Sequence, residues 1–308
     1  MRIGVDLGGT KIEIAALDDH GDVRFRRRVA TPRGDYAGTI RAIAGLVEEA
    51  EGTAGAGTVG VGIPGAIAPA TGLVKNANST WLNGRPFHQD LSEALAREIR
   101  IANDANCFAL SEALDGSGAG ARVVFGVIVG TGTGAGVVVD GNVLVGPNAI
   151  AGEWGHNPMP WPEPAEWPGP RCYCGRTGCI ETFLSGPGLS REYVGRGGPS
   201  TASHLEVAEL EARAGQGDGA AVAALSTYER RMARALASVI NVLDPDVIVL
   251  GGGLSNISRL YDNVPRLWRP FVFSDEVRTR LLCAREGDSS GVRGAAWLWG
   301  GPGGIQPR

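Results

Sequence analysis

The feature that most constrains the fold is a pattern that occurs twice along the chain. In the first copy, an apolar strand at residues 3–7 runs into a glycine turn at 8–11, and a second strand follows at 12–17. Residues 123–139 repeat this order of strand, glycine turn and strand. A duplication of this kind predicts an α/β protein of two related lobes, each built from a mixed sheet with helices on its faces.

Hydrophobic periodicity extends this prediction to the other elements. Aligning residues 4–8 with 126–130 superposes the apolar positions and the first glycine of each turn. The pattern predicts helices near 35–51, 91–98, 104–114, 220–243 and 292–299, and strands at 23–31, 58–63, 99–102, 137–139 and 246–250. We therefore expect an N-terminal lobe at 1–117, joined by a C-terminal helix at 291–300, a C-terminal lobe at 118–290, and a flexible tail at 301–308.

Charge and composition limit the classes of molecule that the chain is expected to bind. The 29 Lys and Arg against 33 Asp and Glu give a net charge of −4, so the chain lacks the basic field of a nonspecific nucleic-acid or membrane binder. The start of the chain has neither a basic segment nor an apolar signal core, which predicts a cytoplasmic protein. The uncharged stretch at 123–139 is interrupted by glycines and is better explained by two buried strands than by a membrane span. We expect small-molecule partners.

Glycine is the compositional anomaly, with 48 of 308 residues, and it gathers at strand ends where backbone can approach a ligand. Three clusters are candidate phosphate or nucleotide contacts, and their key positions are Gly8, Gly9, Thr10 and Lys11; Thr131, Gly132 and Thr133; and Gly252 and Gly253. Each cluster taken alone also fits an ordinary glycine turn. Their spacing matches neither a P-loop nor a dinucleotide-binding fingerprint.

Asp104 stands where a predicted strand meets a predicted helix, directly after Asn103. One interpretation is that Asp104 caps the helix. The other is that Asp104, at the carboxyl end of a strand in an α/β protein, accepts a proton from a bound hydroxyl while Asn103 binds a second one.

A group of metal-ligating residues follows in the second lobe. His156, Cys172, Cys174 and Cys179 offer one imidazole and three thiols, a set suited to a closed tetrahedral zinc site. The alternative is a surface loop with reduced thiols. Glu153 and Glu181 flank the group and are either ligand-binding or solvated acids. The isolated Cys107 and Cys283 are expected in the core, and the loop at 162–170 shows little constraint.

Together, the turn at 6–11, the Asn103–Asp104 pair, the Glu153-x-Gly-His156 segment and the Cys172-x-Cys174-x4-Cys179-x-Glu181 run resemble the ROK family of bacterial sugar kinases and repressors. The likeness covers nearly the whole chain. Through residues 75–84 it is most similar to the fructokinase or mannofructokinase branch. The resemblance implies an actin-like, hexokinase-type fold of two lobes with a central cleft.

The resemblance also implies roles for individual residues. Asp104 would deprotonate the 6-hydroxyl of a hexose, and Asp6 would lie near the Mg²⁺ that accompanies ATP. The sugar would be bound by Asn78, Asn103, Glu153, His156 and Glu181, while the zinc would be structural. D-fructose is the expected substrate, with mannose second, and glucose or N-acetylglucosamine is the alternative. Repressors of this family carry a DNA-reading domain ahead of the two lobes. A repressor is therefore disfavoured here, because the first strand is expected to begin at Arg2 and leaves no room for such a domain. A homodimer is expected from the resemblance alone.

Overall fold

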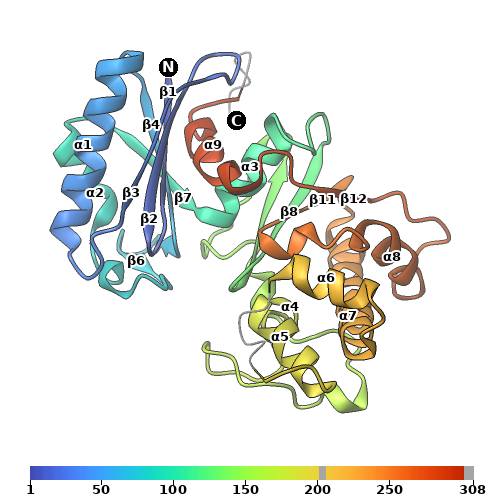
Figure 1. The fold of residues 1–308 in the computed structure, drawn as a ribbon. Helices are drawn as coiled ribbons and strands as arrows, with labels where there is room; N and C mark the ends of the chain where they lie inside the picture. Colours follow the sequence, from blue (N-terminus) through green and yellow to red (C-terminus); the bar gives the residue numbers. More distant parts are fainter. Residues whose placement is uncertain (201–205, 302–308) are drawn as a thin grey trace. The chain divides into compact units, whose positions relative to one another are not determined.

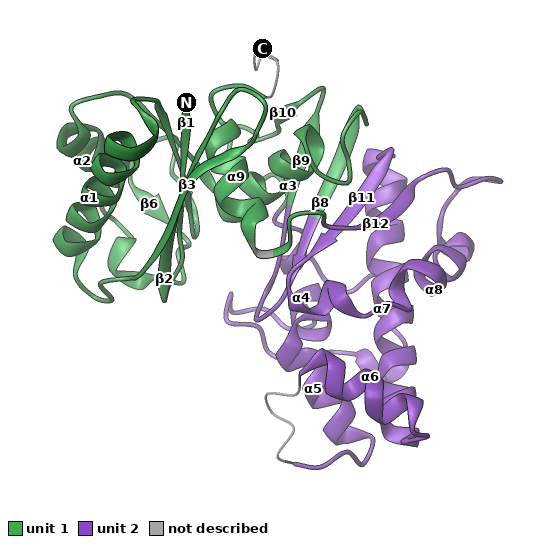
Figure 2. Cartoon of the chain, turned by 45° about the horizontal axis from the view of Figure 1, so that its top comes forward, with its two compact units in different colours: residues 1–126, 136–152, 285–308 green, residues 127–135, 153–284 purple. Residues whose placement is uncertain are grey.

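A computed structural model describes residues 1–200 and 206–301 (Figure 1). The chain divides into two compact units (Figure 2). Unit 1 holds Met1–Gly126, Gly136–Gly152 and Arg285–Arg308, and unit 2 holds Val127–Ala135 and Glu153–Ala284. The predicted lobe boundary at 117/118 stays a prediction. Of the predicted flexible tail, residues 302–308 lie outside the described residues.

Unit 1 contains a five-stranded sheet with the strand order β3-β2-β1-β4-β7. Its strands are β1 (Arg2–Leu7), β2 (Lys11–Leu17), β3 (Val23–Ala30), β4 (Thr58–Ile63) and β7 (Ile99–Asn103). The first three pair antiparallel, whereas β4 runs parallel to both β1 and β7. Two shorter strands, β5 (Ala66–Ile67) and β6 (Val74–Lys75), form a separate hairpin.

The two faces of this sheet differ because successive side chains of a strand point to opposite sides. Ile3 and Val5 of β1 belong to a fully buried apolar cluster that also takes in Ile43 and Leu91. These last two come from helices α1 (Tyr36–Ala54) and α2 (Phe87–Leu95), which Figure 1 shows together on one side of the sheet. One face of β1 is therefore ordinary hydrophobic core.

The other face is built for close approach. Helices α3 (Asp104–Leu114) and α9 (Ser290–Trp297) pack there. A Cβ on Gly4 would lie 2.0 Å from the carbonyl oxygen of Val292, and one on Gly60 would lie 1.9 Å from that of Ala295. Glycine is required at both positions. Asp6, two residues after Gly4, points to this same face.

The second sheet repeats the topology of the first. Its order is β10-β9-β8-β11-β12, so a three-strand meander is again followed by two further strands. The strands are β8 (Val123–Val129), β9 (Thr133–Val139), β10 (Asn142–Val143), β11 (Val247–Gly251) and β12 (Arg280–Cys283). The duplication predicted from the sequence is confirmed. Gly126 also resembles Gly4 in allowing a helix to approach the strand closely, because a Cβ on Gly126 would lie 2.7 Å from Ala109 of α3.

Apart from β11, β12 and its parts of β8 and β9, unit 2 is mainly helical. Its helices are α4 (Ile180–Leu184), α5 (Gly186–Gly195), α6 (Val207–Gly215), α7 (Gly219–Leu243) and α8 (Leu260–Leu267). The long α7 contacts the other four and buries an apolar stripe against them. Short 3-10 turns occupy Thr80–Leu82, Trp154–His156, Pro164–Glu166, Gly253–Asn256, Arg269–Phe271 and Gly287–Ser289. Among the described helices, none combines the length and apolarity that crossing a membrane requires.

Several predictions about local structure were wrong. The strand predicted at 137–139 begins at Thr133 and includes Gly134 and Gly136, which were predicted to lie in the turn. Gly136 is a glycine because the strand packs closely there: a Cβ on it would lie 2.7 Å from the carbonyl oxygen of Ala105. The helix predicted at 91–98 spans Phe87–Leu95. Cys283 is exposed at the end of β12, whereas Cys107 is buried as expected.

The loop at 162–170 is far more constrained than its sequence indicates. Glu166 is 5% exposed and accepts hydrogen bonds from Arg231 at 2.8 Å and Arg234 at 2.7 Å, both on α7. The backbone N–H of Glu163 donates to its other oxygen at 2.8 Å. A buried carboxylate held in this way fixes the loop to the helix.

Candidate active site

The glycine turn after β1 is pinned at both ends. The backbone N–H of Gly8 donates to Lys11 at 2.9 Å, and Thr31 donates from its hydroxyl to the carbonyl of Gly8 at 2.8 Å. The N–H of Thr31 also donates to the carbonyl of Thr10 at 3.0 Å. Gly8 and Gly9 are half-buried, while Thr10 and Lys11 are exposed. The turn is thus a preformed, partly open backbone loop.

Asp6 lies just before this turn in an unusual electrostatic setting. Burial, followed by the charges of Asp104 and Glu13, raises the pKa of Asp6 from 3.8 to about 7, although Lys11 and Arg28 oppose this shift. A Cβ on Gly291 of α9 would lie 3.2 Å from an Asp6 carboxylate oxygen. The structure therefore brings Asp6 and Asp104 close enough to influence each other, as a site with a shared cation requires.

The residue that caps helix α3 is Asn103 and not Asp104. Asn103 is the N-cap of α3, because its Oδ1 accepts from the N–H of Ala105 at 2.9 Å. Its Nδ2 donates to the carbonyl of Gly65 at 3.0 Å. Asp104 is the first helical residue and is exposed, with one oxygen accepting from the same N–H at 2.8 Å. The capping interpretation of Asp104 was wrong, since the preceding residue does this work.

The loop at 76–84 also belongs to unit 1. Asn78 is exposed, and the next residue, Ser79, is 2% exposed. The Ser79 hydroxyl has no hydrogen-bond partner in the described part of the chain, and it lies 3.4 Å from the position of a Cβ on Gly9. Trp81 packs against the apolar cluster under α1, so it anchors the loop. Ser79 was not singled out from the sequence, where a serine between Asn78 and Thr80 carries no distinguishing signal.

In unit 2, the turn between β8 and β9 meets Glu181. The N–H of Thr133 donates to Glu181 Oε2 at 3.0 Å, and a Cβ on Gly132 would lie 2.8 Å from that oxygen. Thr131 is exposed, while the buried hydroxyl of Thr133 has no partner among the described residues. The Gly130 carbonyl accepts from the N–H of Gly186, the first residue of α5, at 2.7 Å.

The third glycine cluster packs on this same turn. Gly252 has a φ of +81°, and a Cβ on it would lie 2.4 Å from the carbonyl oxygen of Val129. Gly253 is exposed, with no atom within 4 Å of its Cβ position. The predicted clusters at 131–133 and 252–253 are therefore neighbours in space, and both leave backbone open to a ligand.

His156, Cys172, Cys174 and Cys179 come together, with all their ligand atoms within 4.8 Å of one another. Cys174 and Cys179 have their sulfurs 3.6 Å apart, and Cys172 Sγ lies 3.6 Å from His156 Nδ1. Zn–S bonds of about 2.3 Å and Zn–N bonds of about 2.0 Å at tetrahedral angles imply S···S separations of about 3.8 Å and S···N separations of about 3.6 Å. The donor set and its spacing fit a tetrahedral zinc ion.

Two more residues border this cluster. Tyr173, which was not predicted, places its hydroxyl 3.0 Å from His156 Nε2, with the two rings edge to face at 5.1 Å. The sequence feature that could have indicated Tyr173 is its position between Cys172 and Cys174. Cys172 Sγ lies 3.9 Å from Glu181 Oε1, so Glu181 links the cluster to the turn at Thr133. Glu153 is exposed and close enough to raise the pKa of Tyr173, after burial and Glu181.

The predicted site residues thus form two sets. Unit 1 holds Asp6, the turn at 8–11, Asn78, Asn103 and Asp104, whereas unit 2 holds the glycine turns, Glu153, Glu181 and the cysteine cluster. The first set offers interacting carboxylates beside a backbone turn. The second offers backbone donors beside a rigid loop that a metal can fix. These are the elements that nucleotide and metal binding require.

Comparisons with known proteins identify the family of the chain. A family model described as the ROK family matches residues 2–301. The chain is 40% identical over 303 residues to an N-acetyl-D-glucosamine kinase of Photobacterium profundum, covering 97% of this chain and 99% of that one. It superposes on a ROK hexokinase from Thermus thermophilus with a TM-score of 0.82 and 32% identity, covering 96% of both chains.

A ROK family glucokinase from Streptomyces griseus, solved with glucose and AMPPNP, matches with a TM-score of 0.77 and 28% identity over 96% of this chain and 98% of that one. These neighbours confirm the predicted actin-like α/β fold class. The resemblance to the ROK family is confirmed as well, whereas the expected similarity to its fructokinase branch is not. This chain belongs to the ROK family, and relatives that are 39% to 40% identical to it over nearly their full length are sugar kinases.

Proposed function

We propose that this protein is an ATP-dependent kinase that phosphorylates N-acetyl-D-glucosamine on its 6-hydroxyl. The observation that carries the proposal is the 40% identity to an N-acetyl-D-glucosamine kinase over nearly the full length of both chains. The relatives favour this sugar, given as an alternative from the sequence, over D-fructose, which was the first expectation.

The residues of unit 1 support the chemical step. Asp104 is an exposed carboxylate at the start of a helix and is available to accept the proton of a sugar hydroxyl. Asp6, with its interacting carboxylate neighbours, suits the Mg²⁺ that accompanies ATP, because a divalent cation stabilises clustered negative charge. Gly8, Gly9, Thr10 and Lys11 would contact the phosphates. Phosphoryl transfer depends chiefly on such positioning and charge neutralisation.

The residues of unit 2 would supply further ligand-binding groups. Thr131, Gly132 and Thr133, together with the adjoining Gly252 and Gly253, offer open backbone for the nucleotide. Sugar-binding roles would belong to Glu153, His156 and Glu181 in this unit and to Asn78 and Asn103 in unit 1. Because Asn103 uses one N–H and one lone pair of its amide to bond to backbone, its contribution would come through the second N–H of Nδ2 or the remaining lone pair of Oδ1.

A structural zinc ion would be held by His156, Cys172, Cys174 and Cys179. It would fix the loop that carries these residues and thereby the position of Glu181 and the His156 ring. His156 Nε2, on the side of the ring away from Cys172, faces the Tyr173 hydroxyl, which would orient the imidazole.

The test is an ADP-release assay over N-acetylglucosamine, glucose, mannose, N-acetylmannosamine and fructose at saturating ATP and Mg²⁺. The highest kcat/KM is expected for N-acetylglucosamine. A clearly higher value for fructose or glucose would overturn the substrate assignment but leave the kinase intact. Failure of every sugar to stimulate ADP release would overturn the kinase itself. Phosphatase treatment and mass spectrometry of the product would locate the phosphate.

The protein would act as a homodimer through an exposed apolar patch on unit 2. The Trp161 and Phe271 rings lie 5.3 Å apart, and Asn241 bonds to the backbone of Phe271 and Phe273 at 2.8 Å each. Phe273 is fully exposed, and Val242, next to Asn241, is 89% exposed. Exposed apolar side chains that gather around one residue, here Asn241, are typical of a surface that another chain covers.

A further inference from the structure

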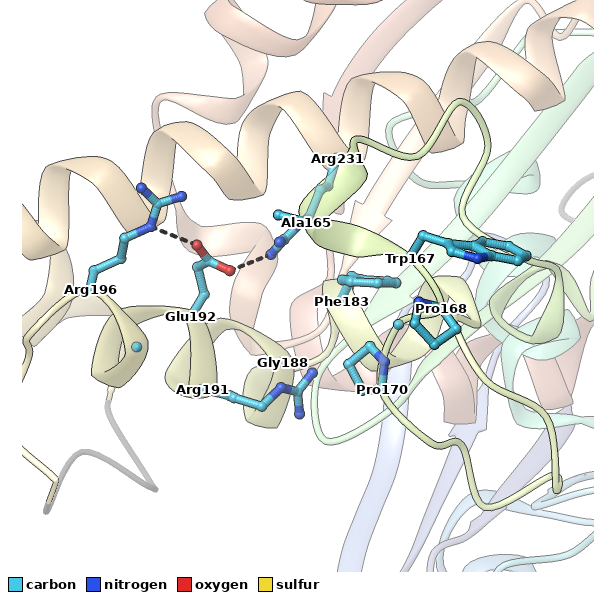
Figure 3. A pocket seen from close by; sticks show the side chains of 12 residues that line it. Ala165, Trp167, Pro168, Pro170, Phe183, Gly188, Arg191, Glu192, Arg196 and Arg231 are labelled. Atoms are coloured by element: carbon cyan, nitrogen blue, oxygen red, sulfur yellow. Dashed lines mark hydrogen bonds and ion pairs between the residues drawn. The ribbon is translucent and has the colours of Figure 1, made fainter.

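A pocket of about 450 Å³ opens in unit 2, lined by none of the predicted site residues (Figure 3). Its walls come from the loop at 165–170, from Phe183 of α4, from α5 and its C-cap, and from Arg231 of α7. Its volume lies within the range of about 300 to 1,000 Å³ that small-molecule sites occupy. The loop that forms one wall is the one that Glu166 fixes to α7.

The pocket carries an excess of positive charge. Arg191, Arg196 and Arg231 line it, and Glu192 is the only acid among its lining residues. Figure 3 shows Glu192 between Arg196 and Arg231, with bonds of 2.8 Å to each. Arg231 bonds in addition to the buried Glu166. These two arginines are therefore held in place by carboxylates, as the walls of a preformed site are.

Arg191 is different. It extends from α5 away from the Glu192 pair in Figure 3, and its guanidinium donates to the carbonyl of Thr182. In the described part of the chain no carboxylate forms an ion pair with it. Burial and the charge of Arg231 lower the pKa of Arg191, although the charge of Glu192 opposes this shift. A guanidinium has five N–H donors, so most of them remain for a ligand.

The other walls are apolar. Trp167, Pro168 and Pro170 line one side, and Phe183 lies under Arg231 with the guanidinium carbon 4.9 Å from the ring centroid. Trp167 is 74% exposed, which leaves its indole face available. Rings of this kind pack against the body of a small organic molecule, while arginine recognises phosphate through paired N–H donors.

We propose that this pocket binds a small phosphate ester, with the phosphate on Arg191 and the organic part against Trp167, Pro168 and Pro170. Inorganic phosphate has the same kind of anionic group but no organic part. It should bind more weakly, because it cannot contact the apolar walls. The site is separate from the proposed kinase site and does not depend on the identity of the sugar.

The test uses phenyl phosphate as the probe, in isothermal titration calorimetry with the full chain at 0.15 M salt and without sugar or ATP. Inorganic phosphate tests the contribution of the walls, and benzyl alcohol tests the contribution of the charge. Arg191→Met should weaken phenyl phosphate binding by about tenfold or more, the effect of losing a charge-assisted hydrogen bond. Arg278→Met removes a cation from an exposed ion pair elsewhere in unit 2 and should leave binding unchanged.

A second pair of variants removes any ambiguity from misfolding. Gly195 lines the pocket, and a Cβ there meets no atom within 4 Å. Gly195→Asp and Gly195→Asn differ in charge but hardly in size, so the aspartate variant alone should lose phenyl phosphate affinity. Equal affinity in these two variants and in Arg191→Met would overturn the proposal, since the probe would then be held at another place such as the glycine turns. Binding of inorganic phosphate as tight as that of phenyl phosphate would contradict the assigned apolar wall.

Discussion

Asp6 and Asp104 interact, yet their surroundings differ. Asp6 is partly buried on the sheet face that packs against α9, and its pKa is raised to about 7. Asp104 is exposed at the first position of α3. A group in the first setting needs a cation to stay charged at neutral pH, whereas a group in the second is accessible to substrate. The two settings support a metal-binding role for Asp6 and a proton-accepting role for Asp104.

Replacing Asp104 by Asn should lower kcat by about 10²- to 10⁴-fold, the usual effect of losing a general base. Folding should survive, because Asn103 is the residue that caps α3 and Asp104 is exposed. The measurements are ADP release with N-acetylglucosamine and thermal unfolding of the same sample. A variant with near-normal kcat would remove Asp104 from the chemical step.

Asp6 should make stability depend on pH. The folded chain holds the Asp6 proton more tightly than the unfolded chain does, with a pKa of about 7 against 3.8. Asp6 therefore favours folding most below about pH 4, and this contribution is lost as the pH rises to about 7. Asp6→Asn, which stays neutral, should be more stable than the wild type at pH 8, with a smaller difference at pH 5.

Urea unfolding without Mg²⁺ at the two pH values measures this difference for Asp6→Asn. The same difference at pH 5 and pH 8 would show that Asp6 has an ordinary pKa in the folded chain. Asp140→Asn supplies a control, because Asp140 lies in the turn after β9 and is not one of the charged residues that shift the pKa of Asp6.

At the scale of elements, the loop that carries the cysteine cluster is held by few regular hydrogen bonds. The N–H of Cys172 donates to Arg176 at 2.8 Å, and that of Gly178 donates to Pro170 at 2.9 Å. Isolated β-bridges join Arg171 to Thr177 and Pro158 to Cys179, and a metal would add to this order. A zinc ion in this place would contribute folding free energy to the loop rather than take part in the chemistry.

The purified protein should therefore contain about one zinc ion per chain, as expected for one tetrahedral site. Cys174→Ser should lose the metal and most of the activity, since a hydroxyl is a much weaker zinc ligand than a thiolate. Cys283→Ser is the matched control, because Cys283 is also exposed but lies outside the cluster. Elemental analysis by mass spectrometry decides the matter: active wild-type protein without zinc would refute the site.

The contact between the 165–170 loop and α7 should be a strong local determinant of stability. Burial alone would raise the pKa of Glu166, but hydrogen bonds from Arg234 and Arg231 lower it, so the carboxylate is charged between two buried cations. Glu166→Ala should cost about 3 to 5 kcal/mol of unfolding free energy, because it leaves the buried Arg234 without a carboxylate and Arg231 with Glu192 alone. Urea unfolding tests this, with Glu276→Ala, at an exposed ion pair, expected to change stability by less than about 1 kcal/mol.

For the whole molecule, the sequence predicted what repeats or clusters along the chain. The duplicated pattern at 3–17 and 123–139 corresponds to two sheets of one topology, and the cysteine run corresponds to one compact cluster. What it could not predict depends on partners distant in sequence. Ser79 beside Gly9 and Glu166 between two α7 arginines are examples, because neither carries a local signal. The sugar substrate could not be predicted from the motifs either, because members of the family share them.

The proposed homodimer is the property of the whole molecule that one exposed residue can test. Phe273 stands fully exposed two residues after Phe271, whose ring lies 5.3 Å from that of Trp161, and burying Phe273 against a second chain would remove apolar surface from water. Phe273→Ser should therefore raise the dimer dissociation constant by about tenfold or more, since burying a phenylalanine side chain is worth about 1.5 to 3 kcal/mol. Val145→Ser, at a residue that is 48% exposed in unit 1, should leave it unchanged. Sedimentation over a range of protein concentrations measures both variants, and a wild-type chain that sediments as a monomer at every concentration would reject the homodimer.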